Sequence, residues 1–173
     1  MKRLNVVKFL VDAMLGKLAR FLRIFGYDTL FANDLVEFYD VDPIPDDQLL
    51  DYATKSKRMI ITKDYPFFKR INEKAIYLKG EGVYNYLAQL KRNLNLKFEY
   101  RIEKARCTVC NSTLKEISEK ESIKDLILPD TYNHYDVFFQ CENVNCKKIY
   151  WKGSHIDDIE NKLSISSNLE KMN

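Results

Sequence analysis

Short apolar segments that alternate with segments of helical periodicity constrain the fold of the first hundred residues most strongly. Four apolar segments are predicted strands: residues 2–11, 27–32, 58–62 and 75–78. The predicted helices are residues 14–25 and 83–94, a helix that starts at Asp46 and a short helix over 67–71. Residues 33–45 are predicted to be a loop with at most a fragment of helix. Strands separated by helices of this length imply a parallel sheet covered on both faces, so we predict an α/β domain over residues 1–100.

The character of the sequence changes after Tyr100, where charged residues and short β-like segments replace the helical alternation. All four cysteines fall in this part of the chain, beside predicted strands over 138–140 and 148–152. Ser154 is suited to cap a final helix that ends near Leu163. We therefore assign residues 101–163 to a small second unit with a closing helix, and we expect residues 164–173 to be frayed.

The cysteines form two closely spaced pairs with thirty residues between them: Cys107 with Cys110, and Cys141 with Cys146. Two tight turns of this kind can each present two thiolates to one tetrahedral metal, so we predict a closed zinc site in a zinc ribbon. Four sulfur ligands leave no open position for substrate, and the zinc is therefore expected to stabilise structure. The alternatives are disulfides or unrelated core cysteines.

Three aspartates stand at the ends of predicted elements: Asp12 ends the first strand, Asp64 follows the third, and Asp46 opens the helix between the second and third strands. The carboxyl ends of parallel strands lie along one edge of a sheet, so these acids are expected to converge. Convergent carboxylates bind hard divalent cations such as Mg²⁺ or Mn²⁺, which can activate water for phosphodiester hydrolysis. Taken singly, each aspartate is better explained as an ordinary turn residue or helix cap than as a metal ligand.

Basic residues accompany both regions. Lys17 and Arg20 on the first predicted helix and Lys63 beside Asp64 are suited to guide phosphates, whereas Arg23 is expected on a solvated helix face. Around the cysteines lie Lys104, Arg106, Lys147, Lys148, Tyr150, Trp151 and Lys152. These residues either stack bases and neutralise phosphates, or pack the small core of the ribbon and face solvent.

Several classes of protein are disfavoured by what the sequence contains. Clustered glycines of the phosphate-binding type are missing, and the two histidines, His134 and His155, lie too far apart for a HExxH site. The net charge of +3 is too weak by itself to diagnose nucleic-acid binding. The apolar segment 6–11 closes on Asp12 and suits neither a signal-peptide core nor a membrane span, so we expect a soluble cytoplasmic protein with no membrane partner.

Several motifs, taken together and in this order, resemble the Mut-seven C-terminal ribonuclease domain family. They are FLVDAMLGKLARFLRIFGYDT over 9–29, DDQLLDYA over 46–53, MIITKD over 59–64, the two cysteine pairs and YWKGSH over 150–155. The resemblance covers nearly the whole chain, from about residue 8 to 163. It implies a PIN-like nuclease domain with a zinc ribbon, in which Cys107, Cys110, Cys141 and Cys146 bind zinc.

The resemblance also implies roles for particular residues. Asp12, Asp46 and Asp64 match the acidic positions of a metal-dependent ribonuclease site, and Lys17, Arg20, Lys63, Trp151 and His155 are family motif positions that are candidates for substrate binding. PIN nucleases usually have a fourth acidic residue. The candidates for it are Asp28, Asp34, Glu37 and Asp47.

The leading hypothesis is an endoribonuclease that prefers single-stranded RNA and uses Mg²⁺ or Mn²⁺ at Asp12, Asp46 and Asp64, with the ribbon helping to hold RNA. The alternative is a binding protein on structured RNA or the ribosome, whose acidic site is weak or silent. A third hypothesis, a metal-dependent phosphatase of small molecules, uses the same acids.

Overall fold

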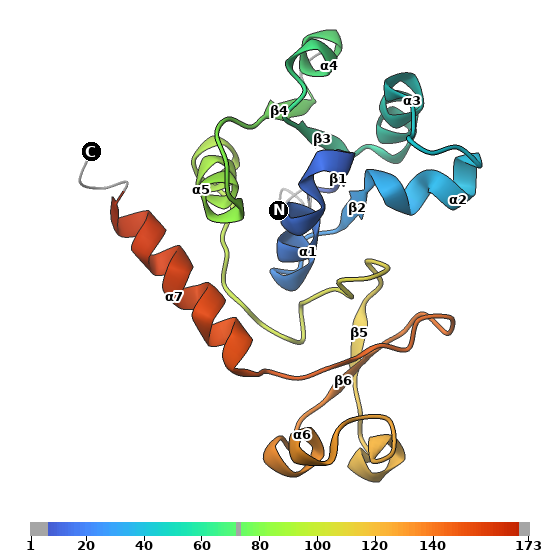
Figure 1. The fold of residues 1–173 in the computed structure, drawn as a ribbon, viewed down its shortest axis with the longest axis vertical. Helices are drawn as coiled ribbons and strands as arrows, with labels where there is room; N and C mark the ends of the chain where they lie inside the picture. Colours follow the sequence, from blue (N-terminus) through green and yellow to red (C-terminus); the bar gives the residue numbers. More distant parts are fainter. Residues whose placement is uncertain (1–6, 72–73, 170–173) are drawn as a thin grey trace, which may run out of the picture.

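The computed structural model describes residues 7–71 and 74–169, and its larger sheet has four parallel strands (Figure 1). The strands are β1 (Phe9–Val11), β2 (Thr29–Phe31), β3 (Met59–Thr62) and β4 (Ala75–Tyr77), in the order β2-β1-β3-β4. The four predicted strands are therefore confirmed, although residues 2–6 of the first lie outside the described residues. The prediction of an α/β fold with a parallel sheet flanked by helices is also confirmed.

Helices cover both faces of this sheet, which explains why its strands are almost continuously apolar. Phe9 and Val11 pack on one face with α1 (Gly16–Ile24) and α5 (Val83–Leu94), while Leu10 packs on the other. That second face is covered by η2 (Ala32–Leu35), α3 (Asp46–Ser56) and α4 (Tyr65–Arg70). Two short helices complete this part of the chain: η1 (Ala13–Leu15) and α2 (Val36–Tyr39). The prediction of a loop over 33–45 with at most a fragment of helix is therefore wrong for its first half, since η2 and α2 follow one another from Ala32 to Tyr39.

The second, smaller sheet is antiparallel and lies below the parallel sheet in Figure 1. It consists of β5 (Leu114–Glu116), β6 (Phe139–Cys141) and β7 (Ile149–Tyr150), in that order. Two short helices, η3 (Lys120–Ile123) and α6 (Pro129–His134), connect β5 to β6. The sequence predicted β6 and β7, but it did not predict β5 or α6, because charged and polar residues mask any period in these short elements. We call residues 101–153 the ribbon.

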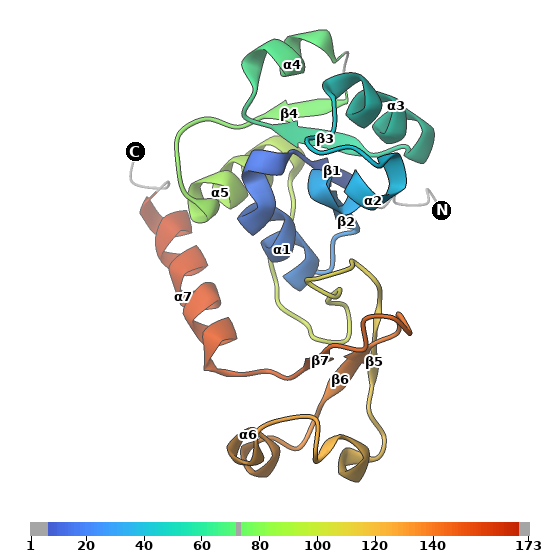
Figure 2. The same ribbon diagram turned by 45° about the vertical axis from the view of Figure 1, so that its right-hand side comes forward.

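The final helix, α7 (Ser154–Leu169), leaves the ribbon and runs beside α5 (Figure 2). Ile159 on α7 is only 1% exposed and belongs to the same core as Phe9 and Leu87. The backbone is helical as far as Leu169, so the segment from Ser164 that we expected to fray continues the helix, and residues 170–173 lie outside the described residues. The division of the chain near residue 100 stays a prediction.

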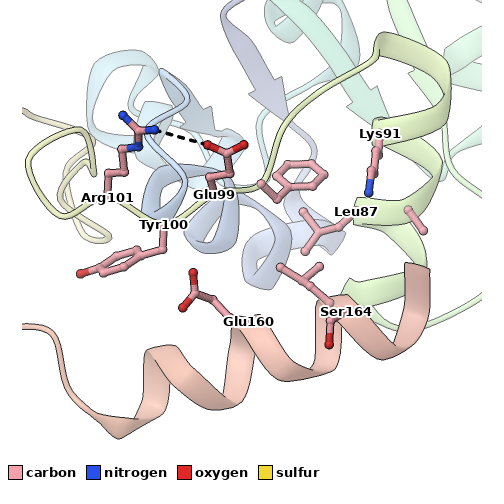
Figure 3. Close-up of a pocket in the computed structure, with 10 residues that line it drawn as sticks. Leu87, Lys91, Glu99, Tyr100, Arg101, Glu160 and Ser164 are labelled. Atoms are coloured by element: carbon pink, nitrogen blue, oxygen red, sulfur yellow. Dashed lines mark ion pairs between the residues drawn. The ribbon is translucent and has the colours of Figure 1, made fainter. Parts of the chain in front are cut away.

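A cavity of about 490 Å³ lies between α5, α7 and the segment that connects the two sheets (Figure 3). Leu87 and Lys91 reach it from α5, and Glu160 from α7. Tyr100 lines it from the connecting segment, and burial raises the pKa of Tyr100 to about 12. The Tyr100 phenol therefore stays uncharged in this cavity at pH 7 and well into the alkaline range.

Arg23 on α1 is the main polar link between the parallel sheet and the ribbon. Its Nε donates to the carbonyl of Thr29 at 2.8 Å, and its Nη1 donates to the carbonyls of Thr108 at 3.0 Å and Val109 at 3.1 Å. Its Nη2 forms an ion pair with Asp34. Arg23 is only 2% exposed, so the expectation of a solvated side chain is wrong: the ribbon covers this face of α1.

Replacing Arg23 with Met should lower the free energy of unfolding by about 3 kcal/mol, because Asp34 would lose its ion-pair partner and the carbonyls of Thr29, Thr108 and Val109 would lose a donor. Urea denaturation followed by circular dichroism measures this effect. Arg20→Met, an exposed position on the same helix, is the matched control and should change stability by less than about 0.5 kcal/mol. Equal effects of the two substitutions would show that the buried contacts do not stabilise the joint.

Candidate functional site

The carboxyl ends of β1 and β3 bring Asp12 and Asp64 to the same edge of the parallel sheet. The side chain of Thr62, the last residue of β3, joins them: its Oγ1 donates to Asp12 Oδ2 at 2.5 Å and accepts from the Asp64 backbone N–H at 2.9 Å. The strand order β2-β1-β3 places this pair at the point where the connections diverge to either side, which is where ligands bind in open α/β sheets.

Both aspartates also stabilise the start of a helix. Asp12 Oδ1 accepts from the Ala13 backbone N–H at 2.6 Å, and Asp64 Oδ1 accepts from the Phe67 backbone N–H at 2.8 Å. These bonds orient each carboxylate while a carboxylate oxygen retains further lone pairs for another partner. The capping interpretation and the ligand interpretation are therefore compatible for both residues.

Asp46 is the first residue of α3 and not its cap, because Pro45 occupies the capping position and no side chain caps the helix. The expectation that Asp46 caps this helix is therefore wrong. Burial raises the pKa of Asp46; the Arg70 guanidinium opposes this effect, and the charges of Asp64 and Asp12 add to it. Since Asp12 and Asp64 raise this pKa, the three carboxylates share one region of negative potential.

Arg70 on α4 partly neutralises this region. Its Nη1 lies 3.3 Å from Asp46 Oδ2, and its Nη2 pairs with Asp47. The Arg70 side chain is 49% exposed, so these ion pairs face solvent and are weak. Another anion or a cation can therefore compete with them at low cost.

Carboxylate oxygens are the ligands that Mg²⁺ and Mn²⁺ prefer, so the donor chemistry of this edge fits such a cation. Across residues 7–71 and 74–169, only the four cysteines form a cluster that could share a metal, with ligand atoms all within 4.8 Å of one another; Asp12, Asp46 and Asp64 do not form such a cluster. Mg²⁺ usually binds through one or two carboxylates together with waters and substrate phosphates. A looser arrangement of Asp12, Asp46 and Asp64 is compatible with that mode of binding.

Of the three basic residues that the sequence suggested for substrate binding, two are exposed and one is paired. Lys17 and Arg20 are exposed on α1, with Lys17 Nζ 5.9 Å from the centre of the Phe21 ring. Lys63 turns away from Asp64, since its Nζ pairs with Glu81 and lies 5.6 Å from the centre of the Tyr86 ring.

The four candidates for a fourth acidic ligand lie in different parts of the structure. Asp28 precedes β2, so it lies at the amino end of the strand, where Arg58 at 2.7 Å and Asn111 at 2.8 Å bond it. Burial would raise its pKa, but these bonds outweigh burial and lower it. Asp34 pairs with Arg23, and Glu37 is exposed on α2. Asp47 is next to Asp46, shares Arg70 with it and acts on its pKa, so it is the candidate that the structure ties to one of the three acids.

The four cysteines meet at one point of the ribbon. Cys107 Sγ lies 3.6 Å from Cys146 Sγ, and Cys110 Sγ lies 3.3 Å from Cys141 Sγ. Zn–S bonds of about 2.3 Å in a tetrahedron imply S–S distances of roughly 3.8 Å, close to these values. The thiols are free and not joined as disulfides. The cluster is therefore suited to zinc.

Tyr150 on β7 supports this cluster from outside. Its hydroxyl lies 3.1 Å from Cys107 Sγ, accepts from the Thr108 backbone N–H at 3.0 Å, and has its pKa raised by burial. A neutral phenol beside a metal-bound thiolate orients the ligand and excludes water. Nothing in the sequence pattern indicated this role, because Tyr150 resembles a surface aromatic there.

Trp151 and His155 lie away from the acidic edge. They line an apolar cavity of about 290 Å³ that also touches Ile24, at the opposite end of α1 from Asp12. The nine residues of α1 span about 13 Å. The Trp151 ring centre is 6.1 Å from those of both Tyr135 and Phe138, so the indole packs within the ribbon.

Among the described residues, no helix combines the length and the apolar character that crossing a membrane requires.

Together these features define an α/β protein with an acidic edge on a parallel sheet and a four-cysteine ribbon. The family model described as Mut7-C RNAse domain matches residues 7–163, and the chain belongs to that family. No curated protein matches the sequence. Membership indicates a nuclease or RNA-related function.

The purified protein should contain one equivalent of zinc per chain, because the four thiols match a tetrahedral zinc shell. Plasma mass spectrometry of Cys141→Ser should show loss of this zinc, whereas the exposed Ser118→Ala, also on the ribbon, should retain it. Zinc-free protein with all four cysteines in disulfides would contradict the zinc site.

Proposed function

We propose that the protein is a metal-dependent endoribonuclease that hydrolyses RNA phosphodiesters at the edge formed by Asp12, Asp46 and Asp64. The observation that carries this proposal is the pair of hydrogen bonds made by the Thr62 hydroxyl, which we call the Thr62 bridge. They connect the Asp12 carboxylate after β1 to the Asp64 backbone N–H after β3. A buried polar residue at the end of an apolar strand costs stability unless it is bonded, and here both of its bonds serve the acidic pair. Membership of an RNase family agrees with this chemistry.

In this proposal Asp12, Asp46 and Asp64 hold Mg²⁺ or Mn²⁺. The bound cation supplies activation of a water and neutralisation of charge on the phosphoryl group. The chain's own residues position the ligands: Thr62 fixes Asp12, and the start of α4 fixes Asp64. Arg70, which pairs with Asp46, can exchange this partner for an incoming phosphate.

RNA is the proposed partner, approached through exposed cations. Lys17 and Arg20 on α1 offer phosphate contacts near Asp12, and Lys63 lies beside Asp64 with its charge already paired to Glu81. Trp151 and His155 are proposed to contact RNA farther along the strand, since their cavity lies at the other end of α1. Cytoplasmic localisation and association with the ribosome are hypotheses that rest on the sequence.

Replacing Asp12 with Asn should reduce Mn²⁺-dependent cleavage of a labelled single-stranded RNA by at least about a hundredfold, because a charged metal ligand is removed. Gel electrophoresis of the products measures the rate. The matched control is Asp51→Asn, an exposed aspartate paired with Lys55 on α3, which should cleave at the wild-type rate. Wild-type cleavage by the Asp12 variant would contradict the mechanism.

Replacing Thr62 with Val keeps the shape of the side chain but removes the hydroxyl that orients Asp12. Activity should fall by roughly 10–100-fold, as when an outer partner of a metal ligand is removed, with a higher Mn²⁺ concentration needed for half-maximal rate. Thr54→Val, the same change on the exposed face of α3, should leave the metal dependence unchanged. An unchanged metal dependence in Thr62→Val would remove the bridge from the proposed mechanism.

A second candidate function is RNA binding without appreciable turnover. The specific observation in its favour is that Arg70 pairs with Asp46 and Asp47, which partly neutralises the acidic edge. This candidate predicts that wild-type protein retards RNA on a gel with no cleavage, and that retardation survives Asp12→Asn. Salt-insensitive binding would contradict phosphate contacts.

A further inference from the structure

A cavity of about 370 Å³ lies where the ribbon meets the parallel sheet. Its walls come from α1 through Gly16 and Arg20, from β2 through Phe31, and from the ribbon through Val109 and Lys148. Neither part of the chain forms this cavity alone.

One end of the cavity lies at the carboxyl-terminal edge of the sheet, and the cavity extends from there along α1 to Arg23. Phe31 is the last residue of β2, and Gly16 begins α1 directly after the short helix that Asp12 caps. Both positions belong to the carboxyl-terminal edge of the sheet, where Asp12 and Asp64 also lie. A strand of RNA with its scissile phosphate near Asp12 therefore has this cavity within reach of an adjoining nucleotide.

The charge of the cavity is positive. Arg23 and Asp34 also contribute to the lining, but they form an ion pair, and Arg23 is further bonded to ribbon carbonyls. Arg20 and Lys148 have no carboxylate partner within the described ranges 7–71 and 74–169. Lys148 Nζ lies 5.7 Å from the centre of the Tyr150 ring, an arrangement that leaves its charge available. Two unpaired cations facing one cavity attract phosphate.

The remaining wall is aromatic. The half-buried ring of Phe31 lies against Gly16 so closely that a Cβ at Gly16 would be 3.0 Å from Phe31 Cζ. Glycine at this position thus permits the ring to line the cavity. An aromatic face beside two cations is the combination that binds an unpaired base with its phosphate.

We infer that this cavity binds one unpaired nucleotide of the RNA substrate, with its phosphate contacted by Arg20 and Lys148 and its base by Phe31. The inference rests on the proposed function and adds a specificity for single strands. The volume is at the lower end of the roughly 300–1,000 Å³ typical of small-ligand sites, which suits one nucleotide and excludes a base pair. Because the contacts are to a phosphate and to the face of a base, the subsite is expected to accept any of the four nucleotides.

The test is binding of a fluorescent single-stranded RNA, without added Mg²⁺ or Mn²⁺, measured by anisotropy over a range of salt concentrations. The combined variant Arg20→Gln, Lys148→Gln should bind roughly tenfold more weakly, and its salt slope should fall by about 0.7 for each phosphate that is no longer neutralised. The control Lys115→Gln, Lys124→Gln removes the same charge from exposed ribbon positions outside the cavity and should bind within about twofold of wild type.

Two further measurements distinguish binding of a nucleotide in this cavity from nonspecific attraction between RNA and a positively charged surface. Phe31→Leu should weaken single-strand binding while its thermal midpoint and zinc content verify that the protein is folded. A duplex of the same sequence should bind the cavity variant and the control variant equally, because a paired base cannot enter.

Failure of this inference is distinguishable from failure of the proposed function. If the wild type cleaves RNA but the cavity variant binds single strands as well as the control, only the subsite is wrong. If the wild type neither binds nor cleaves RNA, both the subsite and the proposed function are wrong.

Discussion

The buried positive charge of Arg23 is the constraint on which the arrangement of the two parts of the chain depends. A guanidinium that is 2% exposed needs hydrogen-bond acceptors, and it obtains them from β2, from Asp34 and from the cysteine-bearing turn of the ribbon. A second link, from Asn111 through Asp28 to Arg58, attaches the same turn to the amino end of the sheet. The ribbon is therefore held against the parallel sheet by two sets of hydrogen bonds, in addition to the chain that connects them.

Fixing the ribbon has a chemical consequence for the acidic edge. The same turn that accepts from Arg23 forms one wall of the cavity between α1, β2 and the ribbon, so the ribbon shapes this side of the sheet. A four-sulfur zinc site would take no part in hydrolysis, but the turn that carries two of its cysteines contributes to a surface next to the proposed catalytic edge. The cysteine cluster and the proposed catalytic site are thus linked through the backbone carbonyls that Arg23 contacts.

The sequence predicted those features that follow from local periodicity. The existence of the four parallel strands and the bounds of α5 were predicted because apolar runs and helical spacing are strong signals, and the cysteine spacing indicated the cysteine cluster. The roles of Arg23 and Thr62 were missed because both depend on partners distant in sequence. A partial signal existed for Thr62, since a polar residue on a buried strand face requires a bonding partner. The predicted cap at Asp46 was wrong by one position because Pro45 occupies the capping position.

The separation between Arg23 and its acceptors also bears on synthesis of the chain. Thr108 and Val109 follow Arg23 by 85 and 86 residues, and Ile159, which completes the core beneath α5, is added later still. As the chain leaves the ribosome, all four strands of the parallel sheet are complete before Arg23 can meet these carbonyls. Contacts of such sequence separation slow folding, so the parallel sheet and its helices reach their final packing only after the ribbon and α7 have been made.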